Sequence, residues 1–500
     1  MTKLTSRLFI LALAAVLGAR ADVTLPALLG DHMLIQRGLP VHVWGKAAEG
    51  ESVSVSFRGG TRSTMADSIG LWSVYLPPGD AGGPFELTVK GNNQITLKDV
   101  LVGDVWVASG QSNMEFPVKE AVNAQAEIAG AGHPNIRLFH VKNKVAHYPL
   151  DDVAAEPWTP CTPESVVDFS AIAYFFGRHL HEKLAVPVGL IETSWGGTPA
   201  EAWTSLRALS ADASLMPVFA WWATMNDDAA THQLRREKEL SQWRRAVDRA
   251  KAEGKQPPEF PWEPNIDNSW TPSGLYNAMI APLTRFPIKG VIWYQGESNA
   301  SSERAWLYAH LFQTMIQDWR RSWGQGDFPF LLVQLANFKT GPDAQWPELR
   351  DAQRQALALS HTGMAVTIDI GDPDDIHPKN KQDVGLRLAL AARAIAYGEK
   401  IEYSGTLFRQ ATPEGRSMRV WFDHTGGGLT ARGGALAGFE IAGSDHKFVP
   451  AEAVIDGATI VVSSTAVTAP AYVRYGWSDD PHCNLYNADG LPASPFRSGE

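Results

Sequence analysis

Cysteine is scarce in this 500-residue chain, which contains only Cys161 and Cys483. Two cysteines are too few for a cysteine-based zinc cluster. A disulfide between them is allowed in an exported protein, but two free buried thiols fit the sequence equally well. The sequence therefore leaves the state of this pair open.

The chain also lacks an excess of positive charge, because its formal net charge is −10 at pH 7. This charge argues against nucleic acid as a partner, since an acidic protein repels a polyanion. Local arginines can still attract a small substrate that carries a single negative charge.

No apolar run is long enough to predict a membrane span. The apolar residues 8–17 follow Lys3 and Arg7 and precede Ala19-Arg20-Ala21. A basic start, a short apolar stretch and an A-x-A site are typical of a secretory signal peptide. We predict that residues 1–21 are removed, which makes the mature protein secreted or periplasmic and free of membrane contact.

A chain of this length exceeds one compact core, so two or three domains are expected. Residues 22–100 alternate short apolar and polar runs, which predicts a small antiparallel β-sandwich. Its expected strands are 41–44, 52–57, 72–76 and 85–89. Strand signals return at 401–500 and predict a second β region, which can pack on the first.

Residues 101–400 alternate helical and strand patterns. Apolar strands are expected at 104–109, 186–191, 291–294, 330–335 and 365–370, and helices at 171–184 and 382–396. This alternation predicts an α/β domain with a parallel sheet that is covered by helices on both faces. An insertion at about 204–275 contains a charged helix at 234–251. It is expected to form a lid or flank of the cleft, or a solvated helix without a role.

The most informative motif is Gly-Gln-Ser-Asn-Met at 110–114, directly after the strand 104–109. A serine at this position presents its hydroxyl at the edge of a sheet, where open α/β folds bind their substrates. The motif is not the G-x-S-x-G elbow of the α/β-hydrolases, because Met114 replaces the second glycine. Ser112 is therefore the candidate nucleophile.

A serine nucleophile needs a base, and Asp374-Asp375-Ile376-His377 supplies one after the expected strand 365–370. Asp374, three residues before His377, can accept the Nδ1 proton and leave Nε2 facing the serine. Asp375 ranks second as the orienting acid. The alternatives are a structural role for His377, or a base at His482 in the second D-x-x-H motif at 479–482.

The oxyanion of an acyl transfer also needs donors. The backbone N–H of Ser112 is one candidate. A second is the N–H of Gly196 or Gly197, which follow the strand 186–191, although paired glycines also occur in ordinary tight turns. The third is the side-chain amide of Gln295, with Asn299 in reserve. Four strand ends would then supply nucleophile, donors and base.

These blocks, together with Gly-Gly-Thr at 196–198 and Trp-Tyr-Gln-Gly-Glu-Ser-Asn at 293–299, resemble those of the SGNH hydrolases and, more narrowly, of the sialate O-acetylesterase family. Similar segments at 31–38, 370–383 and 484–497 extend the resemblance over the mature chain. It implies a flavodoxin-like parallel sheet and removal of acetyl groups from sugar hydroxyls without a metal or an organic cofactor. Within this branch Glu297 is an alternative to Asp374 as the group that orients His377.

The resemblance suggests O-acetylated sialic acid as the substrate, whose carboxylate calls for an arginine. Arg350 and Arg304 are the candidates, and each fits an ion pair equally well. The rival substrate is a neutral glycan such as acetylxylan, for which the tryptophans between Trp195 and Trp346 can serve as a sugar platform or as core packing. A glycan-binding protein without activity is the alternative from another class. The acetyl position and the oligomeric state stay open.

Overall fold

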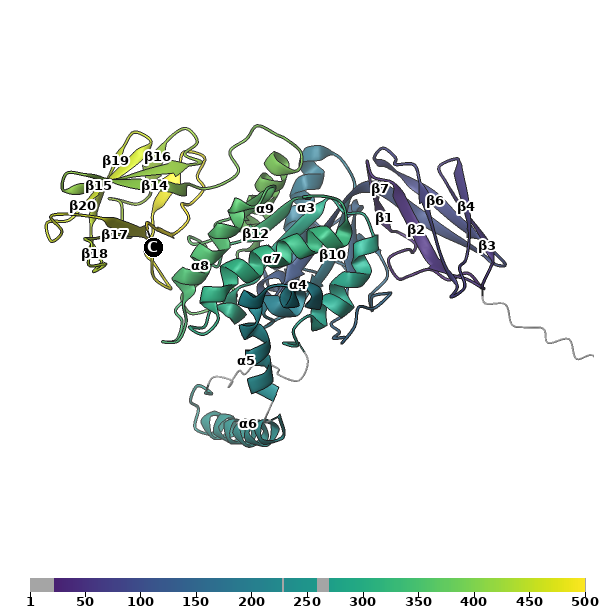
Figure 1. The fold of residues 1–500 in the computed structure, drawn as a ribbon, viewed down its shortest axis with the longest axis horizontal. Coiled ribbons are helices and arrows are strands. Elements are labelled where there is room, and N and C mark those ends of the chain that lie inside the picture. Colours follow the sequence, from purple (N-terminus) through teal and green to yellow (C-terminus); the bar gives the residue numbers. More distant parts are fainter. Residues whose placement is uncertain (1–21, 227–228, 259–268, 500) are drawn as a thin grey trace, which may run out of the picture.

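The computed structural model describes residues 22–226, 229–258 and 269–499. Figure 1 shows a central domain with one β region at each end, the N-terminal region in purple and the C-terminal region in yellow. The expectation that the two β regions pack on each other is wrong, because the central domain lies between them. The predicted signal peptide falls outside the described residues.

The N-terminal region is built from seven strands: β1 Leu34–Gln36, β2 Val41–Lys46, β3 Ser52–Phe57, β4 Gly60–Met65, β5 Leu71–Leu76, β6 Gly82–Lys90 and β7 Gln94–Gly110. The four strands expected from the sequence lie within β2, β3, β5 and β6. Strand β2 pairs with β5, and β3 pairs with β4 and β6. Alternating burial along β3 and β5 reflects the alternating sequence.

Strand β7 connects this region to the central domain without a break. It runs for 17 residues, pairs with β6 in its first half and then enters the central sheet. The predicted boundary at residue 100 therefore falls inside one continuous strand. This continuity fixes the strand that leads to Ser112.

The central sheet has the order β13-β12-β11-β7-β10-β8-β9. Its further strands are β8 His133–His140, β9 Thr159–Cys161, β10 Val188–Ser194, β11 Gly290–Tyr294, β12 Phe330–Val333 and β13 Thr362–Ala365. All neighbours are parallel except β8 and β9. The six parallel strands lie in the order β13-β12-β11-β7-β10-β8. The strand order reverses at β7, so Ser112 follows the strand at which α/β sheets bind ligands.

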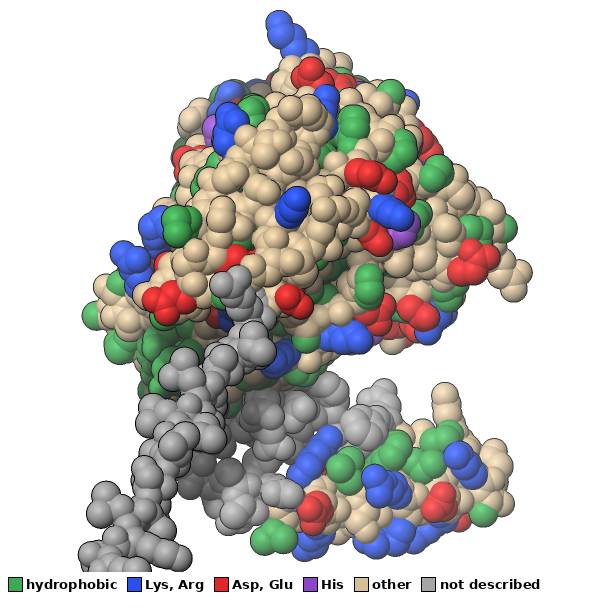
Figure 2. All heavy atoms as spheres, turned by 90° about the vertical axis from the view of Figure 1, so that its right-hand side faces the viewer, with side chains coloured by type: hydrophobic (Ala, Val, Ile, Leu, Met, Phe, Trp, Pro, Cys, Tyr) green, Lys and Arg blue, Asp and Glu red, His purple; other side chains and the backbone are tan. Residues whose placement is uncertain are grey.

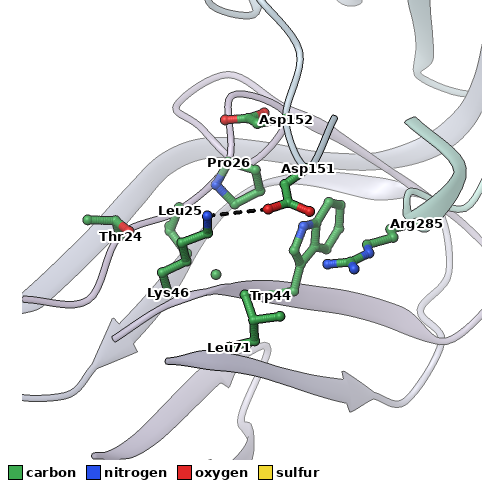
Figure 3. A pocket seen from close by; sticks show the side chains of 10 residues that line it. Thr24, Leu25, Pro26, Trp44, Lys46, Leu71, Asp151, Asp152 and Arg285 are labelled. Carbon is green, nitrogen blue, oxygen red and sulfur yellow. Dashed lines mark hydrogen bonds and ion pairs between the residues drawn. The ribbon is translucent and has the colours of Figure 1, made fainter. Parts of the chain in front are cut away.

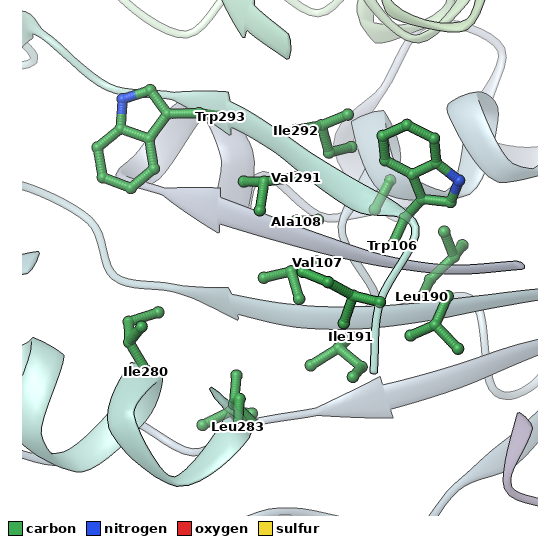
Figure 4. Packing of buried hydrophobic residues seen from close by; sticks show 14 of the residues in the cluster. Trp106, Val107, Ala108, Leu190, Ile191, Ile280, Leu283, Val291, Ile292 and Trp293 are labelled. Atoms are coloured by element: carbon green, nitrogen blue, oxygen red, sulfur yellow. The ribbon is translucent and has the colours of Figure 1, made fainter. Parts of the chain in front are cut away.

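Helices cover both faces of this sheet. Helices α3 (Ala171–Leu184) and α9 (Lys381–Ile395) pack on each other and on the strands of one face, and α7 (Ala305–Trp323) packs with α8 (Trp346–Gln355). Trp106 of β7 contacts Phe176 of α3, whereas Trp293 of β11 contacts Trp319 of α7. Figure 4 shows the apolar side chains of β7, β10 and β11 in this core. The mixed α/β class expected from the sequence is confirmed.

Local signals set the ends of these helices. The Ser170 side chain accepts the backbone N–H of Ala173 at the start of α3, and Asn380 caps α9 in the same way. The strand expected at 365–370 is wrong, because β13 ends at Ala365. The hydroxyl of Thr367 donates to the Gln334 carbonyl and the chain then turns.

The insertion forms helices α4 (Leu206–Ser210), α5 (Pro217–Asn226) and α6 (Ala229–Ala252). The charged helix expected at 234–251 lies within α6. Helix α6 projects below the central domain (Figure 1), and basic, acidic and hydrophobic side chains are interspersed over it (Figure 2).

The C-terminal region contains two four-stranded antiparallel sheets, β14-β15-β20-β19 and β18-β17-β21-β23, and the pair β16-β22. The strands are β14 Leu407–Glu414, β15 Ser417–Asp423, β16 Leu429–Ala431, β17 Phe439–Ala442, β18 Val449–Pro450, β19 Glu452–Asp456, β20 Thr459–Ser463, β21 Tyr472–Tyr475, β22 Leu485–Asn487 and β23 Phe496–Arg497. Both sheets contribute to a core that is separate from the large core of the rest of the molecule. Cys161 and Cys483 are free thiols, and burial raises the pKa of each to about 12.

A small cavity marks the junction between the N-terminal region and the central domain (Figure 3). Its volume is about 180 Å³, and it lies between Trp44 and Lys46 on one side and Asp151 and Arg285 on the other. The Lys46 ammonium contacts the Asp151 carboxylate at 3.4 Å. Both side chains are exposed, so this ion pair contributes little to the junction.

Candidate active site

The turn that carries Ser112 depends on a glycine. Gly110 has φ +141°, and a Cβ at this position would lie 2.0 Å from the carbonyl oxygen of Tyr294. The Gln111 side-chain oxygen then accepts the backbone N–H groups of Gly296 and Ser298 at 3.3 Å. These contacts fix the turn against the loop after β11, and Ser112 begins the short helix α1 (Ser112–Glu115).

The structure brings Ser112 and His377 together. His377 Nε2 lies 2.8 Å from Ser112 Oγ, although 265 positions separate the two residues in the chain. Burial lowers the pKa of His377, and the nearby Lys381 ammonium lowers it further. The imidazole is therefore neutral at pH 7, the form that accepts a proton.

The structure does not bring Asp374 to the imidazole. Its side chain is 84% exposed and contacts the Lys339 ammonium at 3.2 Å. Asp375 lies closer, because its Oδ1 accepts the backbone N–H of His377 at 2.8 Å and lies 3.9 Å from Nδ1. The alternative, Glu297, is half-buried and accepts from Asn113, so it orients the serine turn rather than the imidazole.

The loop after β10 lies beside the serine. A Cβ on Gly196 would be 3.3 Å from the Ser112 Cβ. The N–H of Gly196 is already bound to the Glu115 carboxylate at 2.6 Å. Among the described residues, the N–H groups of Ser112 and Gly197 have no hydrogen-bond acceptor. The geometry therefore favours Gly197 over Gly196 as a donor toward the site.

Gln295 and Asn299 are engaged beneath this loop rather than open to a substrate. The Gln295 Nε2 donates to the Thr198 carbonyl at 3.2 Å and to Asn299 Oδ1 at 2.7 Å, and its Oε1 accepts from the Tyr308 hydroxyl. Asn299 Oδ1 also accepts the N–H of Ala200. Both amides are buried. They hold the loop that presents Gly197, which differs from their expected role as direct donors.

A buried polar network that the sequence analysis missed connects the serine turn to the histidine loop. The Asn113 side chain donates to Glu297 at 2.7 Å and to the carbonyl of Ile376 at 3.0 Å, and it accepts from the Lys381 ammonium at 2.5 Å. Burial lowers the pKa of Lys381 to about 7 and raises that of Glu297. The sequence signal for these two residues was their spacing. Asn113 directly follows Ser112, and Lys381 follows His377 by four residues.

A second missed group is acidic. Glu115 closes the serine helix, and burial together with the neighbouring Glu192 raises its pKa. Glu192 is itself buried and contacts His140 and Ser194. Glu115, His140, Glu192 and Ser194 have one feature in common. Each lies near or just after the end of a strand, at the same edge of the sheet as Ser112.

The C-terminal region reaches the loop that carries His377. The Asp480 carboxylate accepts from the Asn337 side chain at 2.8 Å, and the Asn337 oxygen accepts the backbone N–H of Gly371. The Lys339 N–H donates to the Pro373 carbonyl at 3.0 Å. We call these contacts the loop brace. Asp480 of the second D-x-x-H motif thus supports the loop that carries the first motif, while the His482 side chain is exposed.

Neither predicted arginine is free to bind a substrate carboxylate. Arg350 is fully buried and donates to the carbonyls of Leu335, Ala336, Ser478 and Asp479. The expectation that Arg350 binds substrate is therefore wrong. Arg304 forms an ion pair with Glu201 at 3.0 Å.

The tryptophans include core residues and residues beside the site, and their use as a sugar platform stays a prediction. Trp203, Trp293 and Trp319 are core residues. Trp221 and Trp270 stack on the Arg304 guanidinium at 5.2 and 4.4 Å, and Trp270 donates to the Gly197 carbonyl at 2.7 Å. The two ends of the insertion therefore flank the Gly197 side of the site.

Comparisons with known proteins identify the family. The sialate O-acetylesterase of Rattus norvegicus is 31% identical to this chain over an alignment of 531 residues. The alignment covers 96% of this chain and 95% of the relative. The chain belongs to the sialate O-acetylesterase family. The human sialate O-acetylesterase is 32% identical and covers 91% of this chain and 88% of its own length. The family model described as carbohydrate esterase, sialic acid-specific acetylesterase, matches residues 262–396.

A solved structure agrees with this assignment over nearly the whole chain. A carbohydrate acetylesterase from Xanthomonas citri is 41% identical, has a TM-score of 0.83, and covers 95% of this chain and 99% of its own. The predicted family and the predicted class, a carboxylic-ester hydrolase acting as a carbohydrate O-acetylesterase, are confirmed. Within the described part of the chain, no helix meets the length and apolarity that a membrane crossing requires.

Proposed function

We propose that Ser112 and His377 remove acetyl groups from sugar hydroxyls through an acetyl-enzyme. The contact of 2.8 Å between Ser112 Oγ and His377 Nε2 carries this proposal. Oγ attacks the acetyl carbonyl while Nε2 takes its proton, and the same proton passes to the sugar oxygen as the ester bond breaks. Water then adds to the acetyl-enzyme while His377 takes its proton, and that proton passes to Ser112 Oγ as acetate leaves.

The tetrahedral oxyanion sits against the backbone N–H groups of Ser112 and Gly197. Two arguments support this pair: both N–H groups lack an acceptor among the described residues, and the neighbouring Gly196 approaches the serine closely. Gln295 and Asn299 act as positioning residues, because they hold the loop of Gly197 through Thr198 and Ala200. Two fixed backbone donors stabilise the developing charge without reorganisation.

Asp375 is the carboxylate that supports the imidazolium formed during the reaction. Its Oδ1 lies 3.9 Å from Nδ1, and its hydrogen bond to the His377 N–H keeps it there. Replacing Asp375 with Asn is expected to lower kcat about tenfold, whereas Asp374→Asn at the exposed position changes it less than about twofold. Steady-state kinetics on p-nitrophenyl acetate decides between them, and a larger loss for Asp374→Asn contradicts this assignment.

The sugar is proposed to be part of a neutral acetylated glycan rather than sialic acid. Sialic acid carries a carboxylate that calls for a free cation, but Arg350 is buried on four carbonyls and Arg304 is paired with Glu201. Acetate release from acetylated xylo-oligosaccharides and from O-acetylated sialic acid, measured side by side, tests this preference. A higher kcat/KM on the sialic acid ester overturns it and leaves the esterase proposal intact.

The protein is also proposed to be exported. The basic start, the short apolar stretch 8–17 and the Ala19-Arg20-Ala21 site support this proposal. N-terminal sequencing of the mature protein from culture fluid or periplasm should begin at Asp22. Recovery of the intact Met1 terminus in the cytoplasm contradicts it.

A further inference from the structure

A second cavity lies between the central domain and the C-terminal region. Its volume is about 600 Å³, and it is shallow and widely open to solvent. One wall is the loop after β12 with the start of α8, which contributes Lys339 and Glu348. The other wall is the segment after β21, which contributes Trp477, Asp479 and Asp480.

This cavity is at the same edge of the sheet as Ser112. Its first wall follows β12, and the carboxyl ends of parallel strands meet at one edge. The same wall contacts the loop after β11, because Gln345 N–H donates to the Ala300 carbonyl. It also contacts the histidine loop, where Lys339 binds the Pro373 carbonyl and the Asp374 carboxylate. The cavity therefore borders the loop that carries His377.

The walls are held before any ligand arrives. Arg350 donates to the carbonyls of Ser478 and Asp479 at 2.7 Å, and the Asp479 carboxylate accepts the Thr340 hydroxyl. Trp477 is steadied by the Arg497 guanidinium, which lies 4.8 Å from its ring centroid. Groups that are already ordered lose little entropy on binding, which favours affinity.

The chemistry of the lining selects a neutral polyol. Lys339 and Arg474 carry two positive charges, while Glu348, Asp479 and Asp480 carry three negative ones, which leaves the lining with a small net negative charge. Carboxylates accept from hydroxyl groups and cations donate to them, and the Trp477 ring offers an apolar face. An acidic sugar would meet a net negative lining, which disfavours it.

We propose that this cavity is a subsite for a neutral sugar unit of the glycan chain whose acetyl ester is cleaved at Ser112. The inference rests on the proposed function and adds to it a second point of contact, contributed by the C-terminal region. The enzyme then recognises an oligosaccharide and not only a single acetylated sugar. The aromatic ring of Trp477 contributes most of the binding, and Glu348 accepts hydrogen bonds from sugar hydroxyls.

The first test compares two esters in the full-length enzyme. For Trp477→Ala, the ratio of kcat/KM on an acetylated xylo-oligosaccharide to kcat/KM on p-nitrophenyl acetate should fall about tenfold, through KM. Trp477→Phe keeps an aromatic face and should recover most of this loss. Tyr75→Ala, which removes an exposed aromatic ring from the N-terminal region, is the matched control and should leave the ratio unchanged.

The second test measures binding without catalysis. Calorimetric titration with an unacetylated xylo-oligosaccharide should show binding to the wild type and at least about tenfold weaker binding to Trp477→Ala. Glu348→Gln, a milder change at the opposite wall, should weaken binding about threefold. If Trp477→Ala fails to fold, Glu348→Gln serves as the test variant.

The outcomes separate the two proposals. Unchanged ratios and unchanged binding in both variants overturn the subsite and leave the esterase proposal standing. A wild type that hydrolyses p-nitrophenyl acetate but releases no acetate from any acetylated sugar overturns the proposed function. In that case the titration alone still decides whether the cavity binds sugar.

Discussion

The N-terminal β region shares strand β7 with the central sheet, whereas the C-terminal β region has its own core and meets the central domain through hydrogen bonds. Residues such as Val53 and Val107 belong to one continuous apolar core. At the other end, Tyr403 and Leu407 pack on the edge of this core. Hydrogen bonds add to this junction: Arg350 donates to the carbonyls of Ser478 and Asp479, and Asn337 donates to Asp480.

Each β region therefore supports a different member of the catalytic pair. The N-terminal region fixes the strand that ends at Gly110, two residues before Ser112, because the strand is continuous through both regions. The C-terminal region supports the loop that carries His377, through the loop brace. Apolar continuity gives a rigid attachment, while polar contacts can be removed one at a time, which makes the comparison testable.

The largest effect belongs to the pair itself. Ser112→Ala and His377→Ala should each lower kcat by at least ~10³, since nucleophile and base act as a unit. His482→Ala should be nearly silent, because that side chain is exposed in the C-terminal region and contributes no group to the reaction. Steady-state hydrolysis of p-nitrophenyl acetate measures all three. A large loss of kcat in His482→Ala, together with an active His377→Ala, would place the catalytic base in the second D-x-x-H motif.

The two junctions should respond differently to damage. Arg350→Met removes the Arg350 donor from four carbonyls, of which only those of Ala336 and Asp479 keep a second donor, and should lower the free energy of unfolding by about 3 kcal/mol. Because the C-terminal core is separate, calorimetry should show its transition split from the main one. Gly103→Ala places a Cβ 2.1 Å from the Pro187 carbonyl oxygen and should cost about 1–3 kcal/mol in a single transition. A split in Gly103→Ala contradicts the continuity of the N-terminal attachment.

A smaller effect should follow from breaking the loop brace. Asp480→Ala removes the acceptor of Asn337, which frees Gly371 and should lower kcat about tenfold with little change in KM for p-nitrophenyl acetate. Asp480→Asn keeps an acceptor oxygen and should restore most of the activity. Asp456→Ala, an exposed ion-pair residue elsewhere in the C-terminal region, is the matched control. Equal losses in Asp480→Ala and Asp456→Ala would indicate a general effect on stability.

The smallest effect is a shift in pH dependence. His377 must be neutral to act, so activity falls as pH drops through its pKa, which burial and Lys381 hold below the usual 6.5. Lys381→Met removes the positive neighbour, so the pKa of His377 rises and the acid limb of kcat/KM should move to higher pH. The Asp480 variants lie outside this electrostatic contact and should leave the limb in place. A shift to lower pH in Lys381→Met contradicts the argument.

Several features could be read from the sequence because they depend on neighbouring residues. A glycine, a serine and an apolar strand in succession located the turn of Ser112, and the helix expected at 171–184 coincides with α3. The loop of His377 was located in the same way, although its strand ends at Ala365 and not at 370. Local pattern is enough where the local backbone sets the position of a group.

Other features could not be read, because they depend on which way a side chain turns. Asp374 and Asp375 are adjacent, and only the folded loop decides that Asp374 points to Lys339 while Asp375 contacts the His377 backbone. Arg350 suits a substrate carboxylate by type, but burial commits it to carbonyls. Gln295 has a suitable amide, but its hydrogen bonds are taken by Thr198 and Asn299.

The sequence by itself determined the family, the α/β class, and the serine and histidine that face each other. These follow from residue types in short segments, which strand and helix periodicity place at one edge of a sheet. The tertiary structure alone decided which donors stay free, which carboxylate approaches the imidazole, and how the C-terminal region supports it. Those choices depend on hydrogen-bond competition and burial among residues distant in sequence, and no local pattern records that competition.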